Sequence, residues 1–389
     1  MEIKHFTNKS DLKQSISLRK YVFHSAYTEQ KAKDYGCLLD MADKIGEFKD
    51  NKLLGQVLNL PIKINIYNNE IPAVGINHVG VYPENRSLGI ASDLMVESLK
   101  SAQNHGQIVA ILEPFAPSFY RKFGYDLFTE RISYRVPLKN YPKFKKDKSF
   151  RVVRKPRCEL DDIEIENIWK CYQIVASQTH GMQLRDKTWW QRHNYQYPNL
   201  NYGFVYDGKR ITGYVSYRLN GTTMEIIDFI YLSNDIRQQL WSFLTAHGSN
   251  VFEIIGVSTS NHNLSYDFND PRIEQQLWLN TMIRIVDLKE FLKLWIQSFS
   301  LKSEITFSVE DKFAPWNNGT YKLEGTLVKC DEMEDGFEKI TMQQLAAIFL
   351  GPLSQEQLVQ FMKPDKDSSL LKLINLSRGK KTAHFLGEF

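Results

Sequence analysis

The spacing of apolar residues predicts strands alternating with helices in the first third of the chain. Residues 76–81 form a short apolar run that is typical of a buried strand. Apolar residues recur at helical spacing through 90–102, and the dipeptide His-Gly at 105–106 is a natural helix stop. A second buried strand is predicted at 108–112, and 132–136 alternates between apolar and polar residues as a half-buried strand does.

The turn between the first of these strands and the helix is the most informative stretch. Its sequence from Pro83 onward carries an R-x-x-G-x-A pattern made of Arg86, Gly89 and Ala91. The first N–H groups of a helix have no partner within it, and the helix dipole favours an anion there. Gly89 allows a close approach of the backbone to a ligand, Ala91 keeps that approach open, and Arg86 adds a charge-assisted donor. The pattern predicts a pyrophosphate-binding turn.

A short helix is predicted after the second strand, within the segment 113–125. Pro117 suits its first turn, and Gly124 ends it. The order strand, R-x-x-G-x-A turn, helix, strand, F-Y-R-K-F-G-Y helix, strand resembles the core of the GNAT N-acetyltransferases. In that family the turn holds the coenzyme A pyrophosphate, and the tyrosine of the second motif is the general acid for the leaving thiolate. By position that residue is Tyr120, with Tyr125 in reserve.

The resemblance implies one acetyl-CoA site per chain. Its expected members are Val79, Gly80, Val81, Arg86, Ser87, Leu88, Gly89, Ile90, Ala91, Ser92, Phe115 and Ala116. The strand edge can hydrogen-bond the pantetheine arm as an added strand would, while the helix start takes the pyrophosphate. For the turn alone, the alternative is a helix-opening glycine beside a solvated arginine. For Tyr120, it is a core aromatic residue with a satisfied hydroxyl.

Length and composition narrow the class of protein. A chain of 389 residues is too long for one ordinary core, so two or three domains are expected. The 42% hydrophobic and 24% charged residues are typical of a soluble globular protein, and a net charge of +4 gives no indication of nucleic acid. No apolar run reaches membrane-spanning length, the N-terminus lacks a signal-peptide core, and the cysteines lack metal spacing. We therefore expect a cytoplasmic protein with no metal, no membrane association and no nucleic-acid partner.

The order of elements repeats in the middle of the chain. A helix from residue 161 precedes three strands joined by tight turns, then a helix at 236–247 and a strand at 251–257. Gly55 and Gly213 lie early in corresponding strands, and a His-Gly pair ends the helix of each copy. This match predicts a divergent internal duplication.

The second copy differs from the first at the phosphate-binding turn. It has Leu232-Ser-Asn-Asp235-Ile-Arg237, with no glycine and with an aspartate where phosphate charge would lie. No second F-Y-x-x-F-G-Y segment follows. We expect this copy to keep the fold without the cofactor.

Two polar stretches have two interpretations each. Residues 139–157 carry nine basic residues and interleaved aromatics, as a nucleic-acid patch does, but two prolines and the lack of periodicity favour an exposed connector. In a GNAT-like fold, residues 26–44 help to roof the acceptor pocket, so their acids can attract an amine; the alternative is an ordinary solvated loop and helix. The residues concerned are Tyr27, Glu29, Asp34, Tyr35, Asp40 and Asp43.

The last third of the chain predicts helices packed on a short sheet. A helix is expected at 287–296 and strands at 305–309 and 320–327, and Thr341 with Gln344 forms a capping box. Behind two GNAT-like copies, this arrangement resembles the sterol-carrier-like third domain of the Eis family of acetyltransferases. The implied fold class is mixed α/β (α+β), with two GNAT-like domains in tandem, the second degenerate, and a sterol-carrier-protein-like domain. The expected limits are 1–145, 146–285 and 286–389.

The resemblance implies transfer of an acetyl group from acetyl-CoA to a primary amine of a small cationic acceptor, aminoglycoside-like or polyamine-like. It also implies a hexamer, and a C-terminal tail whose free carboxylate, that of Phe389, is the general base. Spacing alone leaves Glu113 and His78 open for that role. The alternatives are a protein or peptide lysine N-acetyltransferase, or a non-catalytic acyl-CoA and lipid binder that uses the apolar faces around Leu292, Trp295 and Phe361.

Overall fold

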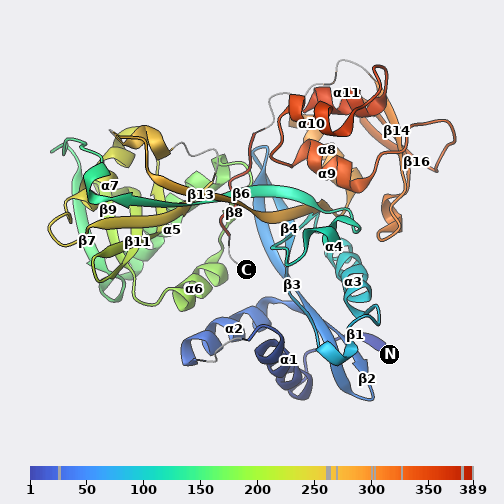
Figure 1. Ribbon diagram of the computed structural model, residues 1–389, viewed down its shortest axis with the longest axis horizontal. Helices are drawn as coiled ribbons and strands as arrows, with labels where there is room; N and C mark the ends of the chain where they lie inside the picture. Colours follow the sequence, from blue (N-terminus) through green and yellow to red (C-terminus); the bar gives the residue numbers. More distant parts are fainter. Residues whose placement is uncertain are drawn as a thin grey trace. The chain divides into compact units, whose positions relative to one another are not determined.

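The computed structural model divides the chain into two compact units, drawn in Figure 1. The first comprises Met1–Thr129 and Asn280–Ala383, and the second comprises Glu130–Leu279 and His384–Leu386. The structure describes all residues except 25–27, 260–263, 269, 299–300, 302–303, 326, 378–380 and 388–389. Within the described residues, no helix has the length and apolar character needed to cross a membrane.

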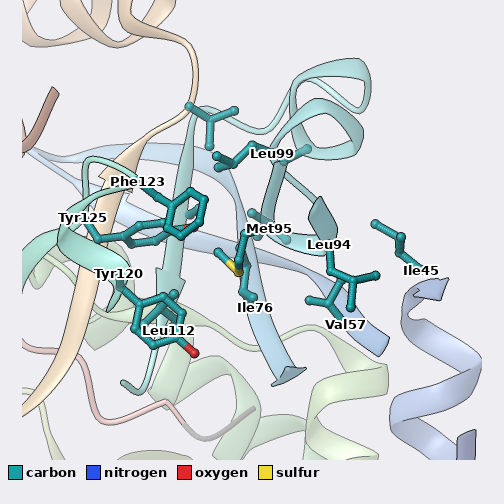
Figure 2. Close-up of a cluster of buried hydrophobic side chains, with 14 of the residues drawn as sticks. Ile45, Val57, Ile76, Leu94, Met95, Leu99, Leu112, Tyr120, Phe123 and Tyr125 are labelled. Atoms are coloured by element: carbon teal, nitrogen blue, oxygen red, sulfur yellow. The ribbon is translucent and has the colours of Figure 1, made fainter. Parts of the chain in front are cut away.

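The first unit is built on a sheet whose strands follow the chain order. They are β1 (Glu2–His5), β2 (Asp43–Lys49), β3 (Lys52–Ile66), β4 (Asn69–Val81), β5 (Val109–Leu112) and the end of β13 (Glu274–Ile285). Neighbouring strands are antiparallel except β4 and β5, which are parallel. The helices are α1 (Lys9–Val22), α2 (Glu29–Met41), α3 (Ile90–Asn104) and α4 (Pro117–Arg121). Figure 2 shows the core beneath α3, where Leu94, Met95 and Leu99 meet sheet residues that include Val57, Ile76 and Leu112.

A β-bulge in β4 opens this sheet on one side. Gln56 of β3 lies opposite Gly80, but Leu58 lies opposite Asn77, so β4 carries one extra residue. His78 in the bulge has a left-handed backbone, with φ of 50°. A bulge bends its strand and ends regular pairing. The pairing of β4 with β5 accordingly stops at Ile76, and the rest of β4 keeps a free edge on the β5 side.

The second unit repeats this plan. Across its sheet the strands are β6 (Asp126–Pro137), β12 (Glu253–Ser258), β11 (Thr223–Tyr231), β10 (Arg210–Asn220), β9 (Asn201–Asp207) and β7 (Arg151–Pro156). Its helices are α5 (Asp162–Gln178), α6 (Lys187–Gln196) and α7 (Asn234–Thr245), and β8 is the short strand Gln183–Leu184. As in the first unit, one neighbouring pair of strands is parallel, here β11 with β12. The register between β10 and β11, the strand before α7, also shifts, as it does between β3 and β4.

Two contacts that recur in both copies confirm the duplication. A Cβ on Gly55 would lie 2.8 Å from Ile90 Cγ2, and a Cβ on Gly213 would lie 2.3 Å from Ile236 Cγ2. In each copy, therefore, a strand glycine makes room for the first buried residue of the helix. At the other helix end, the Nδ1 of His105 bonds the carbonyl of Ser101 at 2.8 Å, and that of His247 bonds the carbonyl of Phe243 at 3.1 Å.

One strand of each sheet comes from the other half of the chain. The residues of β6 from 132 to 137 pair with β12, and Met282–Ile285 of β13 pair with β5. The boundaries between the two units, at 129–130 and 279–280, lie within these two strands. The expected domain limits of 1–145, 146–285 and 286–389 stay a prediction.

After residue 286, the described residues form a separate three-stranded antiparallel sheet and four α-helices. The strands are β14 (Ile305–Val309), β15 (Gly319–Glu324) and β16 (Leu327–Asp331), and the helices are α8 (Leu288–Ser298), α9 (Met342–Phe349), α10 (Gln355–Met362) and α11 (Ser369–Leu376). The expected capping box of Thr341 and Gln344 opens α9. The predicted fold class, two related α/β domains followed by an α+β domain, is thereby confirmed.

Asn8 caps the first helix, because its side chain accepts the N–H of Asp11 at 2.9 Å. One local expectation is corrected. The stretch 139–157 is not only a connector, because its end forms β7 at the edge of the second unit's sheet. Exposed Arg151 and Arg154 lie on that strand, and charges of this kind protect a sheet edge from pairing with other chains.

We predict that Gly55→Ala and Gly213→Ala each lower the free energy of unfolding by about 1–3 kcal/mol, because the added methyl group overlaps Ile90 or Ile236. Gly36 is the matched control: it lies inside α2, and nothing lies within 4 Å of the place that an added methyl group would take. Gly36→Ala should raise stability by about 0.5–1 kcal/mol through helix propensity. Denaturant unfolding measures all three, and an unchanged Gly55→Ala would contradict the shared packing.

Candidate active site

A cavity of about 610 Å³ lies in the first unit where β4 and β5 separate. It is lined by Val22, Phe23, Val79, Gly80, Val81, Asn85, Arg86, Ser87, Gly89, Ile90, Ala91, Ser92, Phe115 and Phe119. All the expected cofactor-binding residues line it except Leu88, which is 54% exposed, and Ala116, which precedes α4. The structure adds Val22 and Phe23, at the end of α1, and two neighbours of the expected set, Asn85 and Phe119.

The N-terminus of α3 opens onto this cavity without a cap of its own. Gly89 is the N-cap residue, with φ of 88°, and no side chain among the described residues accepts its helix's first N–H groups. Ser87, with φ of 67°, also has a left-handed backbone, so the turn winds tightly before the helix. Free N–H groups, the positive end of the helix dipole and Arg86 together form a site for an anion.

The corresponding helix of the second unit is satisfied internally. The Ser233 side chain accepts the N–H of Ile236 at 3.4 Å, which caps α7. Nearby, Arg237 is paired with Asp267, and the same carboxylate accepts the Trp241 indole N–H at 3.2 Å. The start of α7 thus has an internal cap, and the arginine beside it is held by a protein carboxylate.

Tyr120 lies on α4, beside the cavity wall. Its ring centroid is 5.4 Å from that of Phe115 and 5.1 Å from that of Phe119, both of which line the cavity. Burial raises the pKa of the Tyr120 phenol above its ordinary value. Within the described part of the chain, the Tyr120 hydroxyl makes no hydrogen bond to protein. In Figure 2 the Tyr120 ring is drawn beside Leu112, with Phe123 and Tyr125 of the same cluster above it.

The glycine of the F-Y-R-K-F-G-Y motif is required by both conformation and space. Gly124 has φ of 82°, and a Cβ there would lie 2.9 Å from Met342 Cβ and 3.3 Å from Arg284 Nη1. Tyr125, the reserve residue, is fully buried, and burial raises its pKa as well. Like Tyr120, it belongs to the core cluster and is not among the residues that line the cavity.

The residues considered for the general base occupy different environments. His78 Nε2 accepts a hydrogen bond from Arg19 Nε at 2.9 Å, so this nitrogen is already engaged by a permanent cation. Glu113 is exposed just after β5. Phe389 lies outside the described residues.

The tail residues His384–Leu386 belong to the second unit and are held in place there. Phe385 is fully buried. The His384 backbone N–H donates to the His180 carbonyl at 2.8 Å, and its Nδ1 lies 2.5 Å from Thr259 Oγ1. The tail up to this point is therefore an ordered element rather than a frayed end.

The acids expected to attract an amine do not converge on the cavity. Asp43 bonds His5 at 2.7 Å and Ser101 at 2.5 Å, and Glu29 is paired with Lys33. Tyr35 is fully buried beneath the Arg19 guanidinium, and Tyr27 lies outside the described residues. Among the residues that line the cavity, Arg86 is the one charged side chain. No cluster of metal-ligating side chains was found within the part of the chain that the structure describes.

Comparison with known families agrees with this architecture. Residues 2–128 and 181–285 match models of the acetyltransferase (GNAT) domain, and residues 288–380 match the sterol carrier protein domain. An uncharacterised N-acetyltransferase of Streptomyces coelicolor is 23% identical over 314 residues, which cover 72% of each chain. The chain is accordingly a GNAT-class, acetyl-CoA-dependent N-acetyltransferase.

Solved structures show the same three-part fold over the whole chain. A conserved Enterococcus faecalis protein, described as a probable N-acyltransferase, superposes with a TM-score of 0.86 at 24% identity, covering 100% of this chain and 99% of its own. Eis1 from Mycobacterium abscessus superposes with a TM-score of 0.80 at 17% identity and covers 100% of both chains. The fold of this chain is therefore like that of Eis1 over its whole length.

A buried carboxyl near α3 makes stability depend on pH. Glu47 is 3% exposed, faces Gly55 across the sheet, and its Oε2 has no hydrogen-bond partner among the described residues. Burial, and then the nearby Asp93, raise its pKa. An acid whose pKa is raised by folding favours the folded state at low pH, and this contribution is lost as pH rises through the folded-state pKa.

We therefore predict that Glu47→Gln raises the Tm relative to the parent at pH 8 and that this gain shrinks towards about pH 4, near the pKa of an exposed glutamate. The exposed Glu290, 2.6 Å from Lys293, is the control; Glu290→Gln should follow the parent at every pH. If the Tm difference between Glu47→Gln and the parent is the same at every pH, the assignment of a buried carboxyl with a raised pKa is wrong.

Proposed function

We propose that the chain moves an acetyl group from acetyl-CoA to the primary amine of a small cationic acceptor, and that the cavity of the first unit holds the reacting groups. The observation that carries this proposal is the uncapped start of α3, with Arg86 beside it, next to the free edge of β4. Together these features provide donors for a pyrophosphate and a strand edge for an amide-bearing arm.

In this proposal the pantetheine arm lies along Val79–Val81 and reaches the end of β5 at Phe115-Ala116. The pyrophosphate binds at residues 86–92. Among the strands that the structure describes, β3 alone pairs with Gly80 and Val81, so one edge of this segment is available for hydrogen bonds. Apolar Val22 and Phe23 line the same cavity and suit the uncharged part of the arm.

Arg86→Ala and Gly89→Glu should both weaken acetyl-CoA binding in calorimetry. Loss of a charge-assisted donor predicts a fall in affinity of about 10-fold or more for Arg86→Ala. Gly89→Glu should weaken binding further, because it places bulk and negative charge at the anion site. Gly106→Glu is the matched control, since Gly106 also has a positive φ, 67°, but lies beyond the other end of α3 in open space. Equal affinities for Gly89→Glu and Gly106→Glu would remove the turn from the site.

Acetyl transfer requires the amine to attack the thioester, lose a proton, and expel a thiolate that gains one. We assign the second proton to the hydroxyl of Tyr120. Because burial raises its pKa, the phenol stays protonated throughout the neutral and moderately alkaline range. Its position between two rings that line the cavity supports this role, and its hydroxyl makes no hydrogen bond to the residues that the structure describes.

Tyr120→Phe should lower kcat by about 10²-fold, as expected for loss of a general acid, with little change in acetyl-CoA affinity. Tyr125→Phe is the control, because that hydroxyl is buried in the core, and it should keep near-parental turnover. Activity retained in Tyr120→Phe and lost in Tyr125→Phe would move the acid along the motif.

For the proton on the amine we propose the free α-carboxylate of Phe389. The resemblance to the Eis family carries this assignment, and two observations support it. The tail is anchored as far as Phe385, and His78 Nε2 is engaged by Arg19. A terminal carboxylate with an ordinary pKa of about 3.5 is a weak base, and burial would strengthen it. Glu113 is the alternative.

Deleting Phe389, or extending the chain beyond it with a short tag, should reduce kcat strongly while acetyl-CoA affinity and Tm stay unchanged. The same tag placed before Met1 is the control. Full turnover by the C-terminally tagged protein would refute a role for the terminal carboxylate, and Glu113→Gln would then be the next variant to assay.

The acceptor class is open to a direct assay. Thiol release from acetyl-CoA, followed with aminoglycosides, polyamines and lysine peptides, separates a small-molecule enzyme from a lysine acetyltransferase of proteins.

The non-catalytic lipid-binding alternative is weakened by the packing of α8. Leu292 is fully buried, and the Trp295 ring lies 4.6 Å from that of Phe349, so this face is core; Phe361 is 68% exposed. A hexameric assembly and a cytoplasmic location belong to the same proposal, and sedimentation of the purified protein tests the first.

A further inference from the structure

A buried ion pair connects the third region of the chain to the turn that follows Tyr120. Arg284, at the end of β13, is fully buried, and Asp311, in the loop after β14, is 5% exposed. The guanidinium pairs with the Asp311 carboxylate through Nη2 and donates from Nη1 to the Phe123 carbonyl. Breaking such a pair leaves an uncompensated buried charge, so its geometry is strongly held.

The Asp311 carboxylate is itself fixed by its own loop. Its Oδ1 accepts the backbone N–H groups of Phe313 at 3.2 Å and Ala314 at 3.1 Å. Its Oδ2 accepts the Asn317 amide at 3.1 Å. The third region therefore presents a rigid anion to Arg284.

The Phe123 carbonyl that Arg284 binds belongs to the turn that follows α4, the helix that carries Tyr120. The Phe123 N–H donates to the Tyr120 carbonyl at 3.0 Å, and the Tyr125 N–H lies 3.4 Å from the same oxygen. The Phe313 ring lies 4.6 Å from the Phe123 ring, so the same loop also packs against this turn. Gln343 of α9 adds a hydrogen bond to Asp126 at 2.9 Å.

We propose that Asp311, acting through Arg284, is a positioning residue for Tyr120, so that the sterol-carrier-like region takes part in acetyl transfer by fixing the general acid. This inference rests on the proposed role of Tyr120. The chain of contacts runs from Asp311 to Arg284, from Arg284 to the Phe123 carbonyl, and from that turn to Tyr120. A displacement of about 1 Å at a reacting group is enough to cost roughly 10²-fold in rate.

The test is a double substitution that removes both charges together. In Arg284→Met/Asp311→Asn, the asparagine oxygen still accepts the loop N–H groups, and no unpaired charge is left buried. We expect kcat with acetyl-CoA to fall about 10- to 100-fold at unchanged KM for acetyl-CoA. The loss should shrink with an acetyl thioester of a more acidic thiol, which needs less help from an acid to leave. Arg185→Met/Asp228→Asn, a buried pair of the second unit 3.2 Å apart, is the matched control and should keep parental kcat.

A double-mutant cycle with Tyr120→Phe then identifies the route of the effect. If Asp311 and Arg284 act through Tyr120, adding their substitutions to Tyr120→Phe lowers kcat no further. Losses that multiply, or a pair variant as active as the parent, overturn the proposal. An active Tyr120→Phe overturns the role of Tyr120 itself, which is a separate result. If the double variant does not fold, Asp311→Glu keeps the charge pair and shifts it by one methylene, and the same cycle applies: a parental kcat there also overturns the proposal.

Discussion

The site depends on the separation of two parallel strands. In the first unit the bulge at His78 bends β4, its pairing with β5 ends at Ile76, and the backbone from Val79 to Val81 keeps an unpaired edge. The next residues of the chain turn directly into α3, so the same split places uncapped helix N–H groups beside that edge. The free strand edge can exchange hydrogen bonds with the amides of a ligand, and the positive helix end beside it can bind a pyrophosphate. A pyrophosphate ester that carries amide groups requires both features.

The second unit shows how the same fold loses this property. It retains the parallel pair, the bulge, the strand glycine and the histidine at the helix end. It differs at the helix start, where Ser233 supplies an internal cap and Asp267 holds Arg237 and Trp241. It also has no second F-Y-x-x-F-G-Y segment. The features needed for folding and those needed for an anion site are therefore separable within one architecture.

The sequence predicted those parts of the site that are encoded locally. The R-x-x-G-x-A turn and the F-Y-R-K-F-G-Y segment each lie within about a dozen residues, so the turn chemistry of Gly89 and Gly124 can be recognised without tertiary information. The strand and helix order followed from periodicity for the same reason. The second copy's loss of its glycine was visible in the same way.

The remaining features arise from contacts between distant segments. Val22 and Phe23 reach the cavity because α1 packs near β4, and no local pattern marks them. The pairing of β6 with β12 and of β13 with β5 depends on which sheet edges are free in the folded chain. The alternation of apolar and polar residues along each strand is the same whichever edge it joins, so the sequence does not reveal the exchange. Arg284 and Asp311 are 27 residues apart and become a pair only in the folded core. The acids of residues 26–44 look available in the sequence, yet Asp43, the first residue of β2, is bound to His5 and Ser101.

The central claim is that one of the two related helix starts in this chain binds the cofactor. Calorimetric titration of the purified full-length protein with acetyl-CoA tests it most directly, since the stoichiometry does not depend on knowing the acceptor. We expect one molecule bound per chain. Two equivalent sites per chain, or no binding, would contradict the account.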